Sequence, residues 1–203
     1  MSDVRNLTPE QLDALREVAN IGAGHAATAL SEMTNQRIMI SVPRVNIASL
    51  EDVPNQIAEQ EEPVAAVLMQ MMGDLTGLTL LVFPQESALR LASLMMHREA
   101  KEMGKIEKSA IQEAGNILGS SYMNALAEFM GMILMPSPPS LAIDLSSAVL
   151  SSTYVEVTGG AEYVFCVESE FVMQENGERV RGLFLLLPDP PSLSAVLRAT
   201  RVN

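Results

Sequence analysis

The feature that most constrains the fold is an internal repeat, because one short stretch of sequence occurs twice at an offset of 96 residues. The first copy reads DALREVANIG from Asp13, and the second reads SAIQEAGNI from Ser109. The same offset relates positions outside these stretches: Ala29-Leu30 to Ala125-Leu126, Glu32 to Glu128, and Pro43 to Pro139. A unit repeated only twice in 203 residues predicts two related halves of one domain rather than an open solenoid.

Each copy has the pattern of an amphipathic helix, with polar and apolar residues on opposite sides at about 100° per residue. The polar stripe of the first copy is Asp13, Glu17, Asn20 and Gly24, and that of the second is Ser109, Glu113, Asn116 and Ser120. The apolar stripes are Leu12, Leu15, Ala19, Ala26, Leu30 and Met33, and Ile111, Gly115, Leu118, Tyr122, Leu126 and Phe129. We therefore expect each helix to expose a carboxylate and a carboxamide one turn apart. The small residue ending each stripe would let another surface approach closely.

A simpler interpretation is that these polar stripes are ordinary solvated helix faces, which any surface helix shows. The repeat argues against it, because Glu and Asn recur in both copies while their neighbours differ. Arg16 corresponds to Gln112, and His25 corresponds to Ser121. A face that only meets water has no need to keep one acid and one amide at the same two positions.

The pattern Asp/Ser-x3-Glu-x2-Asn-x22-Pro resembles the signature of the CheC/CheX/FliY family of phosphatases of bacterial and archaeal chemotaxis. Both copies fit it, and Pro43 and Pro139 supply the last position. The resemblance covers nearly the whole chain, and two complete sites in about 200 residues are similar to the CheC branch of the family. It implies an α+β fold with a pseudo-twofold axis, in which each half is ordered helix-strand-strand-strand-helix. The halves would span roughly residues 8–104 and 105–203 of one domain, residues 1–203.

The resemblance also implies the chemistry, which is hydrolysis of the aspartyl-phosphate of phosphorylated CheY. Asn20 or Asn116 would orient the attacking water, and Glu17 or Glu113 would pair with the active-site lysine of CheY. The chain would need no cofactor or metal of its own, because the Mg²⁺ would belong to CheY. We expect both asparagines to be exposed.

The remaining positions of the signature are expected to support docking rather than chemistry. They are Asp13, Ser109, Gly24, Ser120, Pro43 and Pro139. The resemblance further implies regulation by CheD, for which Asp144, a lone acid among apolar residues, is a candidate contact. Two other readings stay open: a non-catalytic adaptor or flagellar-switch scaffold that binds CheD or phosphorylated CheY, and a duplicated structural domain without a signalling role. The Glu and Asn pair in both copies favours the enzyme.

Charge and composition exclude several other classes of function. The net charge is −12 and the pI about 4.5, which argues against nucleic acid and against anionic membranes as partners. The N-terminus lacks the pattern of a signal peptide, and no apolar run is long enough to cross a membrane. Cys166, the single cysteine, fits a reducing compartment and reads as a buried structural thiol. We expect a cytoplasmic monomer.

The local patterns predict the following order of elements. A helix begins at a capping box on Thr8 and runs to about Asn35, and a strand from Arg37 to Leu50 is interrupted at Pro43. Next come an acidic linker at 51–62, strands at 63–72 and 78–83, a helix at 85–96, and the second repeat helix at about 105–131. Residues 140–150 read as helix-like, followed by a strand from Tyr163, a strand at 182–187 and a helix at 192–198.

Overall fold

The element order follows the repeat closely. The computed structural model describes residues 8–49, 62–149, 163–173 and 179–199. The first half contains α1 (Pro9–Thr34), β1 (Ile38–Ile40), β2 (Arg44–Ser49), β3 (Pro63–Gly73), β4 (Gly77–Pro84) and α3 (Gln85–Met96). The second half contains α4 (Lys105–Met130), β5 (Leu134–Pro136), β6 (Ser140–Leu145), β7 (Tyr163–Met173), β8 (Arg179–Pro188) and α6 (Pro190–Ala199). From α1 to β2 every boundary recurs 96 residues later in α4 to β6. The predicted helix-strand-strand-strand-helix unit is confirmed, with its first strand divided into two short strands at the signature proline.

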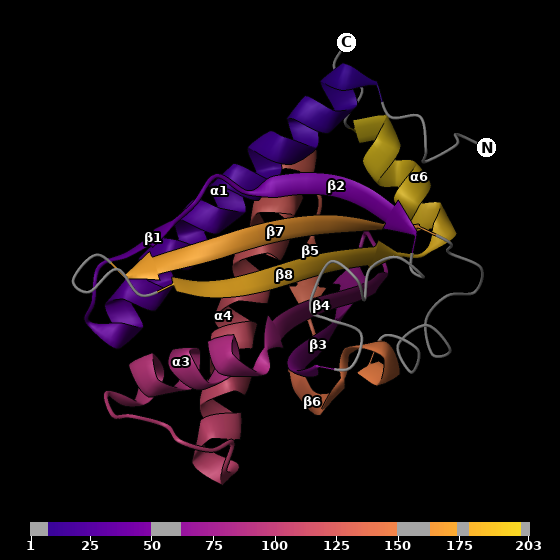
Figure 1. Cartoon of the computed structure of the whole chain (residues 1–203). Helices are drawn as coiled ribbons and strands as arrows, with labels where there is room; N and C mark the ends of the chain where they lie inside the picture. Colours follow the sequence, from indigo (N-terminus) through magenta and orange to yellow (C-terminus); the bar gives the residue numbers. More distant parts are fainter. Residues whose placement is uncertain (1–7, 50–61, 150–162, 174–178, 200–203) are drawn as a thin grey trace.

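The strands form one antiparallel sheet whose two ends are exchanged between the halves. The order is β1-β7-β8-β4-β3-β5, while β2 also pairs with β7 and β6 also pairs with β3. The pseudo-twofold axis therefore passes between β8 and β4 at the centre of the sheet (Figure 1). Because β1 and β2 of the first half pair with a strand of the second half, and β5 and β6 pair with a strand of the first, neither half has a complete sheet alone.

Each signature proline ends a break between two short strands, as expected for a residue that cannot donate a backbone hydrogen bond. Pro43 lies between β1 and β2, and Pro139 lies between β5 and β6. In each break the amide of a serine makes a backbone hydrogen bond to the neighbouring strand. The amide of Ser41 donates to the carbonyl of Glu170 at 2.9 Å, and that of Ser137 donates to the carbonyl of Gln70 at 2.9 Å. The prolines thus shape the edge strands beside α1 and α4.

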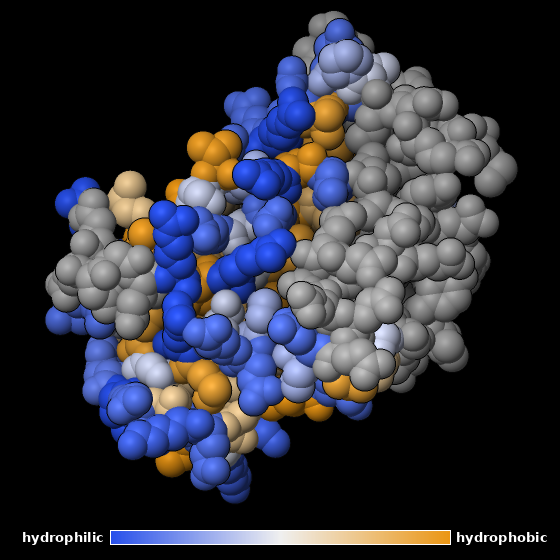
Figure 2. All heavy atoms as spheres, viewed as in Figure 1, coloured by the Kyte–Doolittle hydropathy of each residue, from blue (hydrophilic) through white to orange (hydrophobic). Residues whose placement is uncertain are grey.

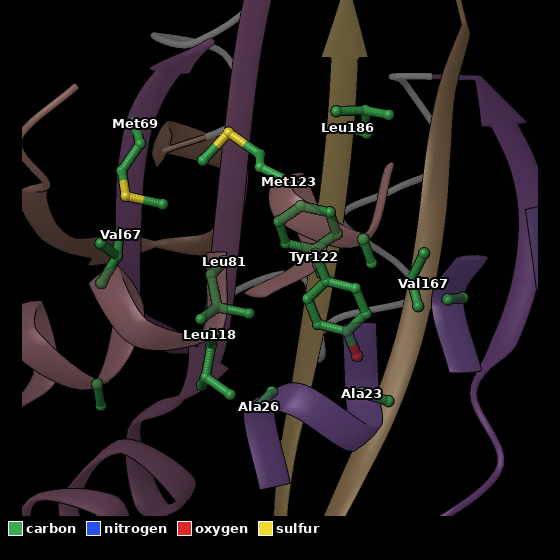
Figure 3. Packing of buried hydrophobic residues seen from close by; sticks show 14 of the residues in the cluster. Ala23, Ala26, Val67, Met69, Leu81, Leu118, Tyr122, Met123, Val167 and Leu186 are labelled. Carbon is green, nitrogen blue, oxygen red and sulfur yellow. The ribbon is translucent and has the colours of Figure 1, made fainter. Parts of the chain in front are cut away.

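The helices pack on one face of the sheet, where α1 and α4 also pack against each other (Figures 1 and 3). Gly22 lies at their crossing, since a Cβ there would come within 2.7 Å of Cδ1 and 3.0 Å of Cα of Tyr122. The Tyr122 ring stacks on Phe184 with centroids 4.6 Å apart, and its hydroxyl lies 2.6 Å from Oγ of Ser169. Burial raises the pKa of Tyr122 to about 12. A neutral, hydrogen-bonded phenol thus joins α4 to β7 and β8.

The opposite face of the sheet is also apolar, and Cys166 lies in it. The cluster there includes buried side chains from β3, β4, β7 and β8: Val64, Ala66, Leu78, Leu80, Val82, Cys166, Leu183, Leu185 and Leu187. Burial raises the pKa of the Cys166 thiol to about 12, so the thiol is neutral at physiological pH. The prediction of a buried structural cysteine is confirmed.

The helix-like interpretation of residues 140–150 is wrong for their first part. Ser140–Leu145 form β6, which pairs with β3 in antiparallel register, with Asp144 opposite Val64. Leu141 and Ile143 are partly buried against the core, while Ala142 and Asp144, which alternate with them, are exposed, and this period of two fits a strand. Helical structure begins only at Ser146 and continues to residue 149.

One predicted segment, the acidic linker at 51–62, lies largely outside the described residues. Asp74 lies in the turn between β3 and β4, and its carboxylate accepts a hydrogen bond from the amide of Ile133 at 2.8 Å. Among the helices that the structure describes, none is both long enough and apolar enough to span a bilayer.

Candidate functional site

The polar stripe of α1 lies on a well-anchored helix. The side chain of Thr8 accepts from the amide of Gln11 at 3.3 Å, and the side chain of Gln11 accepts from the amide of Thr8 at 3.0 Å, which completes the predicted capping box. The opposite side of the helix is buried through Leu15, Ala19 and Ala26, although Met33, expected in the apolar stripe, is 43% exposed. All four members of the stripe, Asp13, Glu17, Asn20 and Gly24, are exposed as predicted.

The polar stripe of α4 is less exposed than that of α1. Ser109 and Glu113 are exposed, whereas Asn116 and Ser120 are only half-exposed. The expectation that both asparagines would be exposed is therefore correct for Asn20 and wrong for Asn116. The side of α4 opposite its polar stripe is deeply buried, because Gly115 and Gly119 let the helix pack closely against β3. A Cβ at Gly115 would lie 2.6 Å from the Val67 side chain.

The four Glu and Asn side chains have no hydrogen bond or ion pair with any residue in the described part of the chain. They are Glu17, Asn20, Glu113 and Asn116. Each carboxylate and carboxamide is therefore available to another molecule. The i, i+3 spacing places the two groups about one helical turn apart on one face. Two such faces are presented on one side of the sheet, one by α1 and one by α4.

The neighbouring residues distinguish the two faces. On α1, Arg16 donates to the carboxylate of Asp13 at 2.9 Å in an exposed ion pair. On α4, Gln112 occupies the position of Arg16, and its Nε2 donates to the carbonyl of Pro139 at 3.3 Å. Ser109 Oγ donates back to the carbonyl of Lys105 at 3.2 Å. A hydrogen bond from Gln112 thus links the second face to Pro139. In the sequence, the two copies differ here only by Gln112 in place of Arg16.

The remaining signature residues divide by burial. Pro43 is buried and Pro139 is half-buried, so both belong to the support of the helices. A Cβ added at Gly24 would meet nothing within 4 Å, so no packing contact in the described structure accounts for a glycine in the middle of α1. Such a position costs about 1 kcal/mol relative to alanine. This open glycine beside Asn20 suits the close approach of another surface.

Other candidate positions lie apart from these faces. Asp144 is exposed on β6, at the edge of the sheet, and its carboxylate accepts from the amide of Leu145 at 2.8 Å. His25 is exposed on α1, next to Gly24. Among the described residues, no group of three or more His, Cys, Asp and Glu side chains has the arrangement of a metal site.

The regions of the chain that match a known protein family contain the same two helices, α1 and α4. The model of the CheC-like family matches residues 10–47 and 106–143, which contain both faces and both signature prolines. The chain is 31% identical over 204 residues to the CheY-P phosphatase CheC of Bacillus subtilis, and the match covers 98% of each protein. The chain belongs to the CheC-like family. Both copies of the family's repeat are therefore present in it.

Solved structures of related proteins share the fold of this CheC-like chain. FliY of Thermotoga maritima superposes with a TM-score of 0.79 at 27% identity, over 96% of this chain and 97% of the other. The CheX of Borrelia burgdorferi, solved as a CheX-CheY-BeF3-Mg²⁺ complex, superposes with a TM-score of 0.50 at 17% identity, over 82% of this chain and 95% of that one. This second likeness concerns the fold alone. The predicted α+β fold with its internal repeat is confirmed.

Proposed function

We propose that the chain is a CheY-P phosphatase with two active faces, one on α1 and one on α4. The observation that carries the proposal is the duplicated, exposed and unpartnered Glu and Asn pair, at positions 17 and 20 and again at 113 and 116. The name of the Bacillus subtilis relative, CheY-P phosphatase CheC, gives the substrate class. The fold relationship to a CheX that binds CheY supports the same partner.

A carboxamide and a carboxylate can hydrolyse a phosphate only with help from the substrate protein. Asn neither ionises nor attacks, but its amide can accept from and donate to a water molecule at once. Phosphoryl transfer depends mainly on positioning and on neutralising charge. We therefore assign Asn20 and Asn116 the positioning of the attacking water in line with the aspartyl-phosphate. The Mg²⁺ that neutralises the phosphoryl oxygens would be held by CheY.

The glutamates would fix the register of the helix on the substrate. Glu17 and Glu113 lie one turn before the asparagines and carry a free carboxylate each. A lysine in the active site of the receiver would pair with that carboxylate. Once this cation is held, the carboxamide one turn further along the helix faces the phosphoryl group. Asp13 and Ser109, one turn earlier, and the small residues Gly24 and Ser120 would shape the contact area rather than take part in the reaction.

We also propose that CheD binds this protein through the sheet edge that carries Asp144. The support is the exposure of this carboxylate on β6, where its neighbour Ile143 packs into the core on the side of α1 and α4, so that Asp144 points to the opposite face of the sheet. A partner bound there would leave both faces open to the substrate. Replacing Asp144 by Asn should weaken CheD binding, measured by titration calorimetry, without changing the phosphatase rate in the absence of CheD. An unchanged CheD affinity would contradict this assignment.

The proposed activity is tested by phosphate release from CheY that is charged with acetyl phosphate in the presence of Mg²⁺. We expect the protein to accelerate release, and we expect Asn20→Ala and Asn116→Ala each to leave partial activity. Loss of all activity in one single variant would assign the reaction to that face alone. No acceleration, combined with measurable binding of phosphorylated CheY, would support the adaptor interpretation instead.

A further inference from the structure

The positive charges of this acidic chain are unevenly placed. Its three lysines all fall within eight residues, at Lys101, Lys105 and Lys108. All three are exposed, and none forms an ion pair or hydrogen bond through its side chain in the described structure. In contrast, five arginines are paired with carboxylates: Arg16, Arg90, Arg98, Arg179 and Arg181. The lysines are thus a local source of uncompensated positive charge.

One of these lysines, Lys105, shares a helix face with the second Glu–Asn pair. Lys105 begins α4, and it precedes Ser109 by four residues and Asn116 by eleven, so the three lie along one stripe at about 100° per residue. Lys108 lies about 80° around the helix from Asn116, at the position equivalent to Leu12, and it is exposed. The amino-terminal turns of α4 project past the sheet at the lower end of Figure 1, and in Figure 2 this end shows hydrophilic side chains with apolar ones between them. The lysines therefore extend the second face toward solvent.

The first face has no counterpart of this charge. The positions equivalent to Lys105 and Lys108 are Pro9 and Leu12. In residues 9–20 of α1 the charged residues are Glu10, Asp13, Arg16 and Glu17, which sum to −2. In the equivalent residues 105–116 of α4 they are Lys105, Glu107, Lys108 and Glu113, which sum to 0. The two helices thus carry the same Glu and Asn, but this part of α4 is more positive than that of α1 by two charges.

The lysines of α4 are placed against the helix macrodipole. Cations near an amino terminus are unfavourable, since the free N–H groups there already carry partial positive charge. Gly104 at the N-cap provides no side-chain hydrogen bond, whereas Thr8 caps α1. The only acid in the first turn of α4, Glu107, is buried and bonded to Arg98 at 2.8 Å. Lys105 and Lys108 thus go against the preference for acidic residues at a helix amino terminus, and no contact in the described structure compensates for them, as is typical of functional positions.

We infer that Lys105 and Lys108 form a docking surface, present only at the second face, for the acidic rim around the phosphorylated aspartate of the substrate. This inference rests on the proposed function. A receiver that binds Mg²⁺ and carries a phosphoryl group needs carboxylates around that site, because Mg²⁺ takes oxygen ligands. A positive surface attracts such a rim and speeds encounter, and the effect weakens as salt increases.

The distances make these lysines positioning residues rather than catalytic ones. Lys105 lies about 12 Å along the helix axis from Glu113 and about 16 Å from Asn116, at 1.5 Å per residue. The lysine side chains would therefore meet the edge of the receiver while the carboxamide meets the phosphoryl group. The separation is comparable to the screening length of about 10 Å at 0.1 M salt. The lysines should therefore affect kcat/KM and its salt dependence, and should affect kcat only weakly.

The test isolates each face before the lysines are changed. Asn20→Ala leaves only the α4 face active, and Asn116→Ala leaves only the α1 face. In each parent, Lys105→Gln with Lys108→Gln is compared with Arg37→Gln and Arg198→Gln, two exposed arginines outside α4 that have no ion pair in the described structure. This control removes the same net charge. The readouts are kcat, KM and the slope of kcat/KM between 50 mM and 0.5 M salt, with phosphorylated CheY as substrate.

We expect the lysine substitutions to lower kcat/KM of the α4 face by about three- to tenfold at 50 mM salt, and by less than about twofold at 0.5 M. The α1 face and the arginine control should change little, and Lys105→Arg with Lys108→Arg should restore the α4 face. The Tm should rise by about 1–3 °C, because cations are removed from a helix amino terminus. If the lysines had only a structural role, their substitution would lower the Tm instead.

The outcomes separate this inference from the proposed function. An active Asn20→Ala parent whose kcat/KM and salt slope do not respond to the lysine substitutions would overturn the docking surface alone. An equal loss at both faces or in the arginine control would also overturn it, because the effect would then come from total charge. An inactive Asn20→Ala parent would overturn both the docking surface and the second active face.

Discussion

At the scale of single residues, equivalent positions of the two copies keep their chemistry while their surroundings differ. Asn20 is exposed beside an open glycine, whereas Asn116 is half-buried beside Ser120. The sequence predicts which residues recur and that they lie opposite a buried stripe. It does not predict their degree of exposure, because exposure depends on how closely each helix approaches neighbouring elements that are distant in the chain.

Cys166 shows how burial of one residue produces a measurable pH dependence. Its pKa is raised to about 12 in the folded protein, from 9.0, by burial. The folded state thus keeps the thiol protonated, and this contribution to stability is complete below the pKa of the unfolded thiol and is lost as pH rises toward 12. The free energy of unfolding should fall with pH above about 9, by up to about 1.4 kcal/mol per pH unit from this group.

The measurement is denaturant unfolding at a series of pH values from 8 to 10.5. Cys166→Ala serves as the control, since it removes the titrating group and leaves the other ionisable residues in place. Tyr122 adds a similar dependence above pH 10 in both proteins, because burial also raises its pKa. The difference between the two slopes isolates the thiol. Equal slopes between pH 8.5 and 10 would contradict the assignment of a buried, protonated Cys166.

At the scale of the element, two glycines in one helix make a matched pair. A Cβ at Gly22 would lie 2.7 Å from Cδ1 and 3.0 Å from the Cα of Tyr122, whereas a Cβ at Gly24 would meet nothing within 4 Å. Gly22→Ala should therefore destabilise the protein by about 1–3 kcal/mol through overpacking. Gly24→Ala should stabilise it by about 0.5–1 kcal/mol, because alanine is the better helix former. Changes of the same sign in thermal or denaturant unfolding would contradict the close crossing of α1 and α4.

Single helices and strands also show where local sequence patterns are enough to predict the structure and where they are not. The bounds of α1 were predictable because Thr8, Pro9 and Gln11 give a complete start signal, and its end follows from the loss of the apolar stripe. The helix expected over Ser140–Leu145 is wrong, because the single small residue Ala142 between Leu141 and Ile143 fits both a helix and a strand. Pairing with β3 decides in favour of the strand, and that partner lies more than sixty residues away in the chain.

At the scale of the whole molecule, the exchange of edge strands makes one domain of the two halves. β1 and β2 pair with β7, and β5 and β6 pair with β3. The repeat in the sequence indicates two similar halves, but it carries no signal that each half completes the sheet of the other. This arrangement is a property of long-range pairing rather than of any local segment.

The exchange predicts that neither half folds alone as a monomer. Fragments 8–104 and 105–203 would each lack the partner of their edge strands and half of the central sheet. We expect each fragment to be unfolded or self-associated, and we expect the mixture to regain a cooperative melt as a 1:1 complex. Circular dichroism and light scattering coupled to size exclusion measure both properties. A folded monomeric fragment with its own cooperative transition would show that the halves are independent domains.

The most direct test of the account is the rate of phosphate release with a variant that lacks both carboxamides. Asn20→Ala with Asn116→Ala should reduce dephosphorylation of CheY to its spontaneous rate, since no group remains to position the water. Asn20 is exposed and Asn116 half-exposed, and neither is hydrogen-bonded in the described structure. The variant should therefore remain folded and still bind beryllofluoride-loaded CheY, with stability within about 1 kcal/mol of the parent. A folded double variant that still accelerates release would contradict the water-positioning role of the two helices.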